Sequence, residues 1–370
     1  MIDRRYFRYF DWISFCITII LLIIGLLFIF SSTYNSEKMF SIFFKKQFFG
    51  VVSGIFIYLY FCIKDLKRFD RLGYLFYFVI LFLLTYSLFV SVLTMGAKRW
   101  ISLYFFKFQP SELSKLFLPI FIAYYFSENN LNDYKFVTQQ IPFKKFFFPI
   151  SILLISFVLI GKQPDLGTAL VILFTGLILL WFIGINKKFF FISMILMTIF
   201  SPFLWSILKP YQKQRILVLL GQGDIKKERY QLEQSKIAIG SGALTGKGFM
   251  QGTQNKLAFL PENHNDFIFS VICEEWGFVG AIFVLLLFCI LFIRISFIIF
   301  QLNSFFEQII AVGLISHFML SVCINIGMVV GILPIVGIPL PLISYGITHL
   351  WINLASLGWL NNIAIRRFYY

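Results

Sequence analysis

Long runs of apolar residues, separated by short polar stretches, dominate this sequence. Each run holds about 20 residues, which is enough for an α-helix to cross ~30 Å of hydrocarbon. The pattern predicts an all-α polytopic membrane protein with about ten transmembrane helices. The predicted spans are residues 12–30, 47–63, 72–93, 111–127, 146–161, 166–185, 188–208, 267–293, 308–331 and 343–364. The first run, after Asp11, is too long for a cleaved signal peptide and lacks a small-residue cleavage site, so it is expected to be the first span.

Basic residues between the runs set the expected orientation, because cytoplasmic loops of membrane proteins are enriched in Lys and Arg. The two termini and the connections after the second, fourth and sixth spans carry these residues: Arg4, Arg5, Arg8, Lys64, Lys67, Arg68, Arg71, Lys135, Lys144, Lys145, Lys187, Lys188, Arg366 and Arg367. Lys45 and Lys46 are exceptions. Both termini are therefore expected in the cytoplasm, with residues 94–110, 209–266 and 332–342 outside. We expect one membrane domain over residues 1–370, with a large extracytoplasmic loop (209–266) between helices 7 and 8.

Composition agrees with this class. The chain is 59% hydrophobic and 13% charged, and no soluble domain could hide so much apolar surface. The formal net charge of +15 comes mostly from Lys and Arg beside apolar runs, which suits anionic lipid head groups rather than nucleic acid. The five cysteines lie in apolar runs without CxxC spacing, so unreactive thiols are expected.

The long loop is basic although it is expected to face outward, and an anionic ligand is the simplest reason. Arg215 and Lys247 are among its cations. Its Gly-rich stretch IAIGSGALTGKG is no P-loop, because Gly248 follows Lys247 where Ser or Thr is required, and no strand leads into a helix there. A tight turn over the membrane surface is the favoured interpretation.

Segment 95–116, MGAKRWISLYFFKFQPSELSKL, combines basic, aromatic and acidic residues at a predicted outer boundary. Lys98, Arg99 and Trp100 suit either membrane anchoring or ligand binding. Glu112 and Lys115 follow at i and i+3 on one helix face. Because a buried ion pair costs desolvation unless it is well satisfied, we expect this pair to line a polar cleft.

Asp165 lies at a break between two predicted spans, in GKQPDLGTAL (161–170). Pro164 stops one helix, and the Asp165 side chain can cap the next one. Capping is the favoured interpretation, and a charge facing a cleft is the alternative.

The stretch KLAFLPENHNDFIFSVICEEWGFVG (256–280) passes from polar to apolar and places Asp266 in the expected first turn of the eighth span, at the water–lipid boundary. A carboxylate there suits a general base, which must reach the proton it removes at ~2.6–3.2 Å. An N-cap is the alternative, and both can hold. His264 is either a second acid/base or a polar loop residue. Glu274 and Glu275 follow roughly 12–14 Å deeper along the helix, where carboxylates are functional or tightly paired.

Two further observations concern the C-terminal half. His317 and His349 lie in predicted spans without metal-ligand spacing, so no zinc site is expected. GILPIVGIPLPLISYG (331–346) is rich in proline and glycine. Broken backbone at membrane depth is tolerated only inside protein or beside a water-filled cavity, so this segment is predicted to be unwound or re-entrant and to border the same cleft.

These stretches together resemble the SEDS family (shape, elongation, division and sporulation proteins), and most closely its RodA-type branch. The resemblance rests on GAKRWI (96–101), FQPSELSKL (108–116), QPDLGTAL (163–170), QSKIAIGSGALTGKGFMQGTQ (234–254), LPENHNDFIFSVICEEWGF (260–278) and NIGMVVGILPIVGIPLPLISYG (325–346). They cover nearly the whole chain in the family's order. Two departures are Asn265 where the family usually has Thr, and Ile347, Thr348 and His349 where it has Gly and then Ser or Thr.

The resemblance implies polymerisation of lipid II into β-1,4 glycan strands of peptidoglycan during cell elongation, at the outer face of the bacterial cytoplasmic membrane. It implies that Asp266 is the essential aspartate, that Trp100 with Lys98 and Arg99 matters for function, and that Glu112 and Lys115 are the family's charged pair. It also implies a class B penicillin-binding protein as partner, within the elongation machinery.

The implied reaction inverts the anomeric carbon, with Asp266 as the single base and undecaprenyl diphosphate as leaving group. Lys98 and Arg99 are the first candidates to bind the pyrophosphate, and Lys247 and Arg215 the second. Asp165, His264 and Glu275 are possible supporting residues. A divalent cation such as Mg²⁺ or Mn²⁺ could assist, but no dedicated oxygen cage or other metal site is expected. The alternatives are a lipid II flippase, a division or sporulation paralogue with the same chemistry, and a non-catalytic scaffold.

Overall fold

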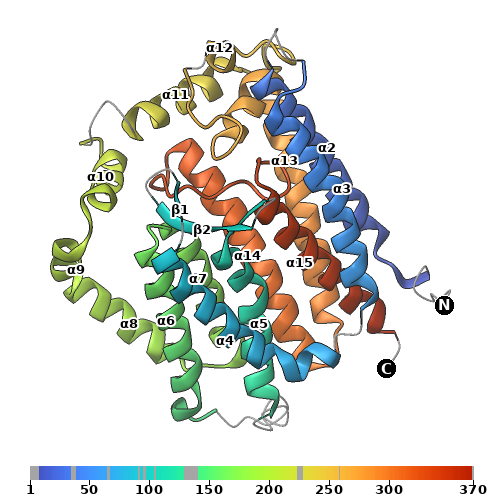
Figure 1. The fold of residues 1–370 in the computed structure, drawn as a ribbon, viewed down its shortest axis with the longest axis vertical. Coiled ribbons are helices and arrows are strands. Elements are labelled where there is room, and N and C mark those ends of the chain that lie inside the picture. Colours follow the sequence, from blue (N-terminus) through green and yellow to red (C-terminus); the bar gives the residue numbers. More distant parts are fainter. Residues whose placement is uncertain are drawn as a thin grey trace.

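A computed structural model of the chain describes residues 8–34, 39–64, 67–90, 92–94, 97–103, 106–128, 141–222, 228–257 and 259–368. Most of these residues are helical, and long helices form a bundle with helices α11 and α12 over one end (Figure 1). The two termini lie near each other at the opposite end, where the Asp11 N–H donates to Asn361 Oδ1 at 3.1 Å. We call the end that carries α11 and α12 the capped end.

The bundle helices match the predicted spans closely. They are α2 (Trp12–Thr33), α3 (Ile42–Ile63), α4 (Lys67–Val90), α5 (Pro110–Glu128), α6 (Phe147–Lys162), α7 (Leu166–Ile183), α13 (Ile268–Phe300), α14 (Phe305–Val330) and α15 (Ile347–Arg366), with a 3-10 turn η2 (Phe143–Phe146) before α6. Seven helices of the described residues are long and apolar enough to cross a membrane. Helices α5 and α15 are not among these seven, because polar side chains interrupt their apolar faces.

The predicted span 188–208 is divided into α8 (Lys187–Ile199) and α9 (Ser201–Ile207), and neither part is long enough to cross a membrane. Figure 1 shows α8, α9 and α10 (Pro210–Leu219) as an arc along one side of the bundle. Large apolar side chains are exposed along this arc, among them Phe191, Met194, Ile199 and Phe203. In a membrane protein such side chains contact lipid.

Small residues bring α3 and α15 close together. A Cβ on Gly358 would lie 2.4 Å from the Tyr58 carbonyl oxygen, and a Cβ on Gly54 would lie 2.5 Å from the Leu354 side chain. Small residues at such contacts let membrane helices approach closely. Helices α3 and α15 are therefore closely packed against each other and form one rigid wall of the bundle.

The prediction of an all-α chain is wrong in one detail, because a three-stranded antiparallel sheet follows α4. It consists of β1 (Val92–Thr94), β2 (Ala97–Leu103) and β3 (Phe106–Phe108), in the order β1-β2-β3. Trp100 pairs with Val92, and Ile101 pairs with Phe108. The seven residues of β2 are too few for a span but long enough to pair on both edges.

The predicted loop 209–266 contains three helices, α10, α11 (Glu228–Ser241) and α12 (Thr253–Lys256). The Ser235 hydroxyl of α11 lies 2.8 Å from the Ser270 hydroxyl of α13 and donates to the Val329 carbonyl of α14 at 2.7 Å. The predicted loop is therefore not a free loop, since α11 is fixed to the two helices beneath it.

Helix α13 changes direction at Gly277, whose backbone has φ 67° and ψ −162°. The Gly-rich turn predicted after α11 repairs the interrupted helical bonds at this bend. Lys247 and Gly248 donate their N–H groups to the Glu274 and Glu275 carbonyls, each at 3.0 Å, and Phe278 and Val279 donate to the turn's carbonyls of Ala243 and Leu244. The predicted tight turn is confirmed.

The two parts of α13 run in opposite directions relative to α14. Before the bend, Asp266 is bonded to Asn325 and Ser270 is linked to Val329 through Ser235, so both chains advance together. After the bend the chain runs back along α14. The rings of Phe288 and Phe292 lie against Phe318, which comes earlier in α14 than Asn325 and Val329.

Helix α13 begins one residue after the start of the predicted span 267–293, but the bend at Gly277 divides it into two parts. Arg294, near the far end of the second part, pairs with Asp11 at 3.0 Å. A straight helix of 33 residues would be roughly 50 Å long, far more than a bilayer core needs. Because α13 bends back at Gly277, its 33 residues do not extend over that length in one direction.

Residues 332–346 have no helix or strand, as predicted for this segment, and we call them the broken segment. They run between α2 and α7: a Cβ on Gly25 would lie 2.7 Å from the Ile343 Cα, and a Cβ on Gly167 would lie 2.9 Å from the Val336 carbonyl oxygen. Most of its side chains are buried, including Ile338 and Leu340. The irregular backbone is therefore enclosed by protein, as a membrane requires.

Candidate functional site

Asp266 lies inside the capped end and not at the start of a membrane span. Its carbonyl accepts a hydrogen bond of 2.9 Å from Asn325 Nδ2. Asn325 stands five residues before the end of α14 at Val330, or roughly 7 Å along the axis. The expectation of a residue at the first turn, on the water–lipid boundary, is therefore corrected to a recessed position before a short helical segment.

The N-cap of α13 is Phe267, whose side chain makes no capping hydrogen bond. Asp266 stands one residue earlier and is half-buried. Its role as a cap, proposed as an alternative from the sequence, stays a prediction.

Gly337 of the broken segment lies against this carboxylate. A Cβ built on Gly337 would be 3.4 Å from Asp266 Oδ2, and Gly337 has a φ of +73° that favours glycine. Glycine thus provides the backbone conformation, and a Cβ at this position would make an ordinary van der Waals contact with the carboxylate.

His264 lies between two aromatic rings, those of Phe43 and Tyr345, at centroid distances of 4.6 and 5.8 Å. Its Nδ1 is 3.1 Å from Asn263 Oδ1. Burial lowers the pKa of His264 below the ordinary 6.5, and the nearby Glu262 carboxylate opposes this shift in part. The imidazole is therefore neutral at pH 7, and its ring is held by packing.

Glu274 and Glu275 are completely buried (0% exposed) and both accept hydrogen bonds, although Glu274 Oε2 has no partner among the described residues. Glu274 accepts hydrogen bonds from Lys247 Nζ at 2.7 Å, from the Thr253 hydroxyl at 3.1 Å and from the Gln254 N–H at 3.0 Å. Glu275 accepts from the Met250 N–H at 3.0 Å and from the Ser31 hydroxyl of α2.

These two carboxylates hold the turn 242–254 against the bend of α13, so tight pairing accounts for them. The expectation that they lie deeper than Asp266 is wrong, because α13 first runs toward the capped end before it reverses. Lys247, expected to bind pyrophosphate, is engaged here in an ion pair with Glu274.

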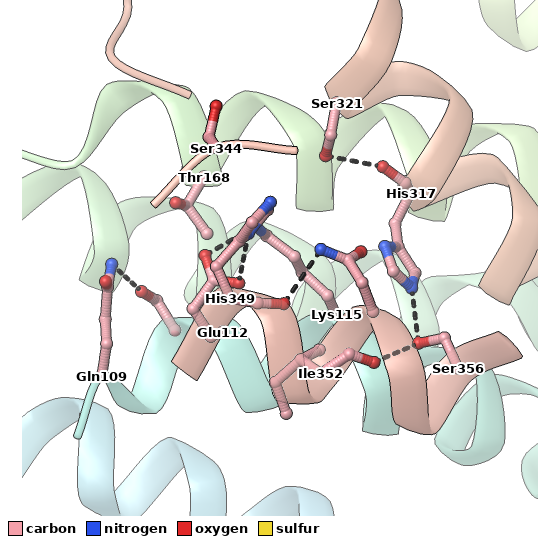
Figure 2. Close-up of polar contacts among 12 residues, drawn as sticks. Gln109, Glu112, Lys115, Thr168, His317, Ser321, Ser344, His349, Ile352 and Ser356 are labelled. Atoms are coloured by element: carbon pink, nitrogen blue, oxygen red, sulfur yellow. Dashed lines mark hydrogen bonds and ion pairs between the residues drawn. The ribbon is translucent and has the colours of Figure 1, made fainter. Parts of the chain in front are cut away.

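Glu112 and Lys115 lie in the packed interior on α5 (Figure 2). Lys115 Nζ donates to Glu112 Oε1 at 2.6 Å, and His349 Nδ1 of α15 is 3.1 Å from Glu112 Oε2. His317 of α14 lies alongside, with its Nε2 3.0 Å from the Ser356 hydroxyl. The group joins α5, α14 and α15 by charge and hydrogen bonds.

Asp165 caps α7, as favoured from the sequence. Its carboxylate accepts from the Thr168 N–H at 3.3 Å and from Gln109 Nε2 at 2.6 Å. Because Gln109 immediately precedes α5, one buried carboxylate fixes the starts of two helices.

The remaining predicted cations are not brought together by the described contacts. The side chains of Lys98 and Arg99 lie outside the described part of the structure, although both residues belong to β2. Trp100 of the same strand is half-buried, and Arg215 belongs to α10. Among the residues that the structure describes, no group of three His, Cys, Asp or Glu side chains could hold a metal ion.

Sequence reasoning missed the polar side chains that hold the Asp266 peptide. They are Gln47 of α3, Asn325 of α14 and Ser344 of the broken segment, and all three are buried. The available signal was an amide inside an apolar run, at Gln47 and at Asn325, because a buried amide needs hydrogen-bond partners.

Comparisons with known proteins agree with these motifs. The profile of the FtsW/RodA/SpoVE family of cell cycle proteins matches residues 11–368. The peptidoglycan glycosyltransferase MrdB of Escherichia coli K12 is 37% identical over 299 residues, which cover 80% of this chain and 78% of the relative. The peptidoglycan glycosyltransferase RodA of Treponema pallidum is 30% identical, over 97% of this chain and 98% of the relative. The stage V sporulation protein E of Bacillus subtilis is 33% identical, with 96% of each chain covered.

Solved structures show the same fold. A chain from a peptidoglycan synthase complex that coordinates polymerization and crosslinking has a TM-score of 0.81 and 25% identity, covering 97% of this chain and 98% of that one. The rod shape determining protein RodA of Thermus thermophilus has a TM-score of 0.71 at 24% identity, with the same coverage. The chain therefore belongs to the FtsW/RodA/SpoVE family of cell cycle proteins, the SEDS family that its motifs resemble, and is a multi-pass membrane protein.

Proposed function

We propose that this chain is a peptidoglycan glycosyltransferase that polymerises lipid II during cell elongation, with Asp266 as its general base. The observation that carries the proposal is the state of Asp266. It is a half-buried carboxylate on irregular backbone just before α13, its peptide is held by neighbouring donors, and Gly337 of the broken segment lies beside its Oδ2. The names of the relatives MrdB and RodA support the same activity.

The proposed reaction is a single displacement. The 4-hydroxyl oxygen of the acceptor's N-acetylglucosamine attacks the anomeric carbon of the donor, and Asp266 takes the hydroxyl proton. The bond from that carbon to the phosphate oxygen breaks, and undecaprenyl diphosphate leaves with the electron pair. Since the donor linkage is α and the product is β-1,4, one inversion is needed, and no second carboxylate must act as nucleophile.

Charge develops on the departing diphosphate, so preorganised cations should stabilise it. Lys98 and Arg99 of β2, together with Arg215 of α10, are the proposed groups. Trp100 would position the sugar or its lipid beside them. Lys247 is a weaker candidate than Lys98, Arg99 and Arg215, because the Glu274 carboxylate already neutralises its charge. A divalent cation, Mg²⁺ or Mn²⁺, is an additional proposal for the diphosphate.

Location and partners follow from the same proposal. The capped end would face outward from the bacterial cytoplasmic membrane, both termini would be cytoplasmic, and the polyprenyl chains would lie in lipid beside the bundle. A class B penicillin-binding protein is the proposed partner. The likeness to a chain from a synthase complex that couples polymerization to crosslinking supports this choice.

The test uses the purified full chain with its transpeptidase partner, labelled lipid II and no other polymerase. Glycan ladders from the wild type, none from Asp266→Asn, and wild-type ladders from Glu233→Gln are expected. Glu233 is a matched control because it is an exposed carboxylate on α11, paired with Arg229. Equal ladders from wild type and Asp266→Asn would reject Asp266 as the base.

The flippase alternative makes a different prediction. Translocation of lipid II across vesicles that survives Asp266→Asn, without any ladder from the wild type, would favour transport. Assignment to elongation rather than division or sporulation is tested by complementation. The gene should restore rod shape to a cell that lacks its elongation polymerase, and should leave a division mutant filamentous.

A further inference from the structure

The peptide that carries Asp266 is held by its backbone. Three consecutive carbonyls, those of His264, Asn265 and Asp266, each accept a hydrogen bond from a different group. The Tyr345 N–H donates to the first at 3.0 Å, the Ser344 hydroxyl donates to the second at 2.6 Å, and Asn325 Nδ2 donates to the third at 2.9 Å. Two of the three donors belong to the broken segment, so the position of Asp266 depends on the position of that segment.

The broken segment cannot hold itself in place by regular structure. Leu342 has a φ of +66°, in the left-handed region that a residue with a Cβ rarely adopts. The Ser344 hydroxyl also accepts from the Leu340 N–H at 2.8 Å, which closes a tight turn within the segment. Backbone of this kind, enclosed at membrane depth, needs partners from neighbouring helices.

Gln47 of α3 supplies such partners at the end of the segment. Its Nε2 donates to the Ser344 carbonyl at 3.2 Å, and its Oε1 accepts from the Gly346 N–H at 3.1 Å. The side chain is 1% exposed. A carboxamide offers a donor and an acceptor side by side, so one side chain satisfies both backbone groups. No aliphatic or carboxylate side chain can do the same.

We infer that Gln47 is a positioning residue for the reaction: through Ser344 and Tyr345 it sets the place of the peptide that presents Asp266. The inference rests on the proposed function for its catalytic consequence. Gln47 acts through the broken segment and does not contact the reacting atoms. Because the wall formed by α3 and α15 is closely packed, it provides a fixed point to which the segment is attached.

The size of the effect follows from geometry. A displacement of about 1 Å at a reacting group can cost about 100-fold in rate. Removing both hydrogen bonds of Gln47 releases the segment end and lets the Asp266 peptide shift. We expect the loss in kcat, because Gln47 acts on the position of the proposed base, and a KM for lipid II close to that of the wild type.

The experiment compares three substitutions in the full chain with its partner. Gln47→Leu removes both hydrogen bonds, and kcat should fall between about tenfold and 100-fold. Gln47→Met also removes both hydrogen bonds but keeps the length of the side chain, so a fall of similar size is expected. It nearly preserves the shape of the side chain, and it decides the question if Gln47→Leu does not fold.

Asn362→Leu is the matched control. Asn362 is also a buried amide between α15 and α3, and its Nδ2 donates to the carbonyls of Phe61, Cys62 and Lys64 at the other end of the same wall. This variant should lose stability comparably while kcat stays at the wild-type value. An equal fall in kcat for Asn362→Leu and Gln47→Leu would overturn the inference, since it would show a general loss of structure.

Hydrogen exchange provides the readout that does not depend on activity. Peptides that contain residues 340–346 and 262–267 should exchange faster in Gln47→Leu than in the wild type, and should be unchanged in Asn362→Leu. A wild type that forms no glycan would defeat the proposed function, and the exchange data would still decide whether Gln47 holds the Asp266 peptide. An active wild type with unchanged kcat and exchange in both Gln47 variants would overturn the inference.

Discussion

The two ends of the first part of α13 carry carboxylates in opposite situations. At one end, Glu274 and Glu275 are fully buried, and every described contact ties them to the turn 242–254 or to α2. At the other end, Asp266 is half-buried just before the helix, the carbonyls of residues 264–266 accept hydrogen bonds from Tyr345, Ser344 and Asn325, and Gly337 lies beside its Oδ2. Buried carboxylates that fix a turn against a helix bend indicate architecture, whereas a half-buried carboxylate on irregular, firmly held backbone indicates chemistry.

The largest effect is expected at Asp266, where a substitution tests whether this carboxylate differs in role from Glu274 and Glu275. Asp266→Asn keeps the size of the side chain but removes the base, and general-base catalysis is worth about 10²–10⁴-fold. We expect polymerisation of lipid II to fall by that amount while the melting temperature stays near that of the wild type. A large fall in melting temperature would instead place Asp266 with the architectural carboxylates.

The next effect concerns the architectural end. Glu274→Leu leaves the Lys247 ammonium without its partner, and loss of a charged hydrogen bond costs about 1–3 kcal/mol. We expect a lower melting temperature and faster proteolysis within residues 242–254, with kcat preserved below the unfolding transition.

Lys247→Met, alone and combined with Glu274→Leu, completes a double-mutant cycle. Strong non-additivity in stability is expected, because the two side chains form one pair. A raised KM for lipid II in Lys247→Met with unchanged stability would contradict this and would return Lys247 to the diphosphate site.

A smaller effect is expected at the space beside Asp266. Gly337→Ala places a methyl group 3.4 Å from Asp266 Oδ2 and imposes a left-handed conformation on alanine, at a cost of about 1–2 kcal/mol. Polymerisation should fall by about tenfold. Gly221→Ala is the matched control, since Gly221 has a φ of +79° and no neighbour within 4 Å. Equal activity losses in the two variants would show that backbone strain alone is responsible.

The smallest effect is the pH dependence of stability that His264 contributes. Its folded pKa is lowered from 6.5 by burial, so the unfolded chain binds more protons just below that pH. The stabilisation is complete above pH 6.5 and is lost as the pH falls through the lowered folded pKa. His264→Phe, which keeps an aromatic ring between Phe43 and Tyr345, should flatten this dependence in thermal unfolding between pH 7 and pH 5. An unchanged slope would show that other groups cause it.

Several features followed from local sequence. Apolar runs located most helices within a few residues, because a membrane span must be long and apolar. Asp165 as a cap followed from the break at Pro164, and the unwound segment after α14 followed from its prolines and glycines. Each of these depends on neighbours along the chain.

Other features depended on contacts between distant residues and could not be predicted that way. At the bend at Gly277 the turn 242–254 supplies N–H groups that repair the interrupted helical bonds, and because of this bend Asp266 and Glu274 do not follow the direction of the rest of α13. The strands β1 to β3 form only by pairing with each other.

The sequence alone therefore determined the membrane class, the family and the candidate base, since these are carried by composition and by motifs of adjacent residues. Only the tertiary structure decided that Glu274 and Glu275 hold the turn 242–254 and that Asp266 lies on irregular backbone held by α14 and the broken segment. The physical reason is that a buried charge or an unpaired backbone group is satisfied by whatever lies nearest in space. For Asp266 and its peptide, those neighbours are Asn325, Ser344 and Tyr345, far away along the chain.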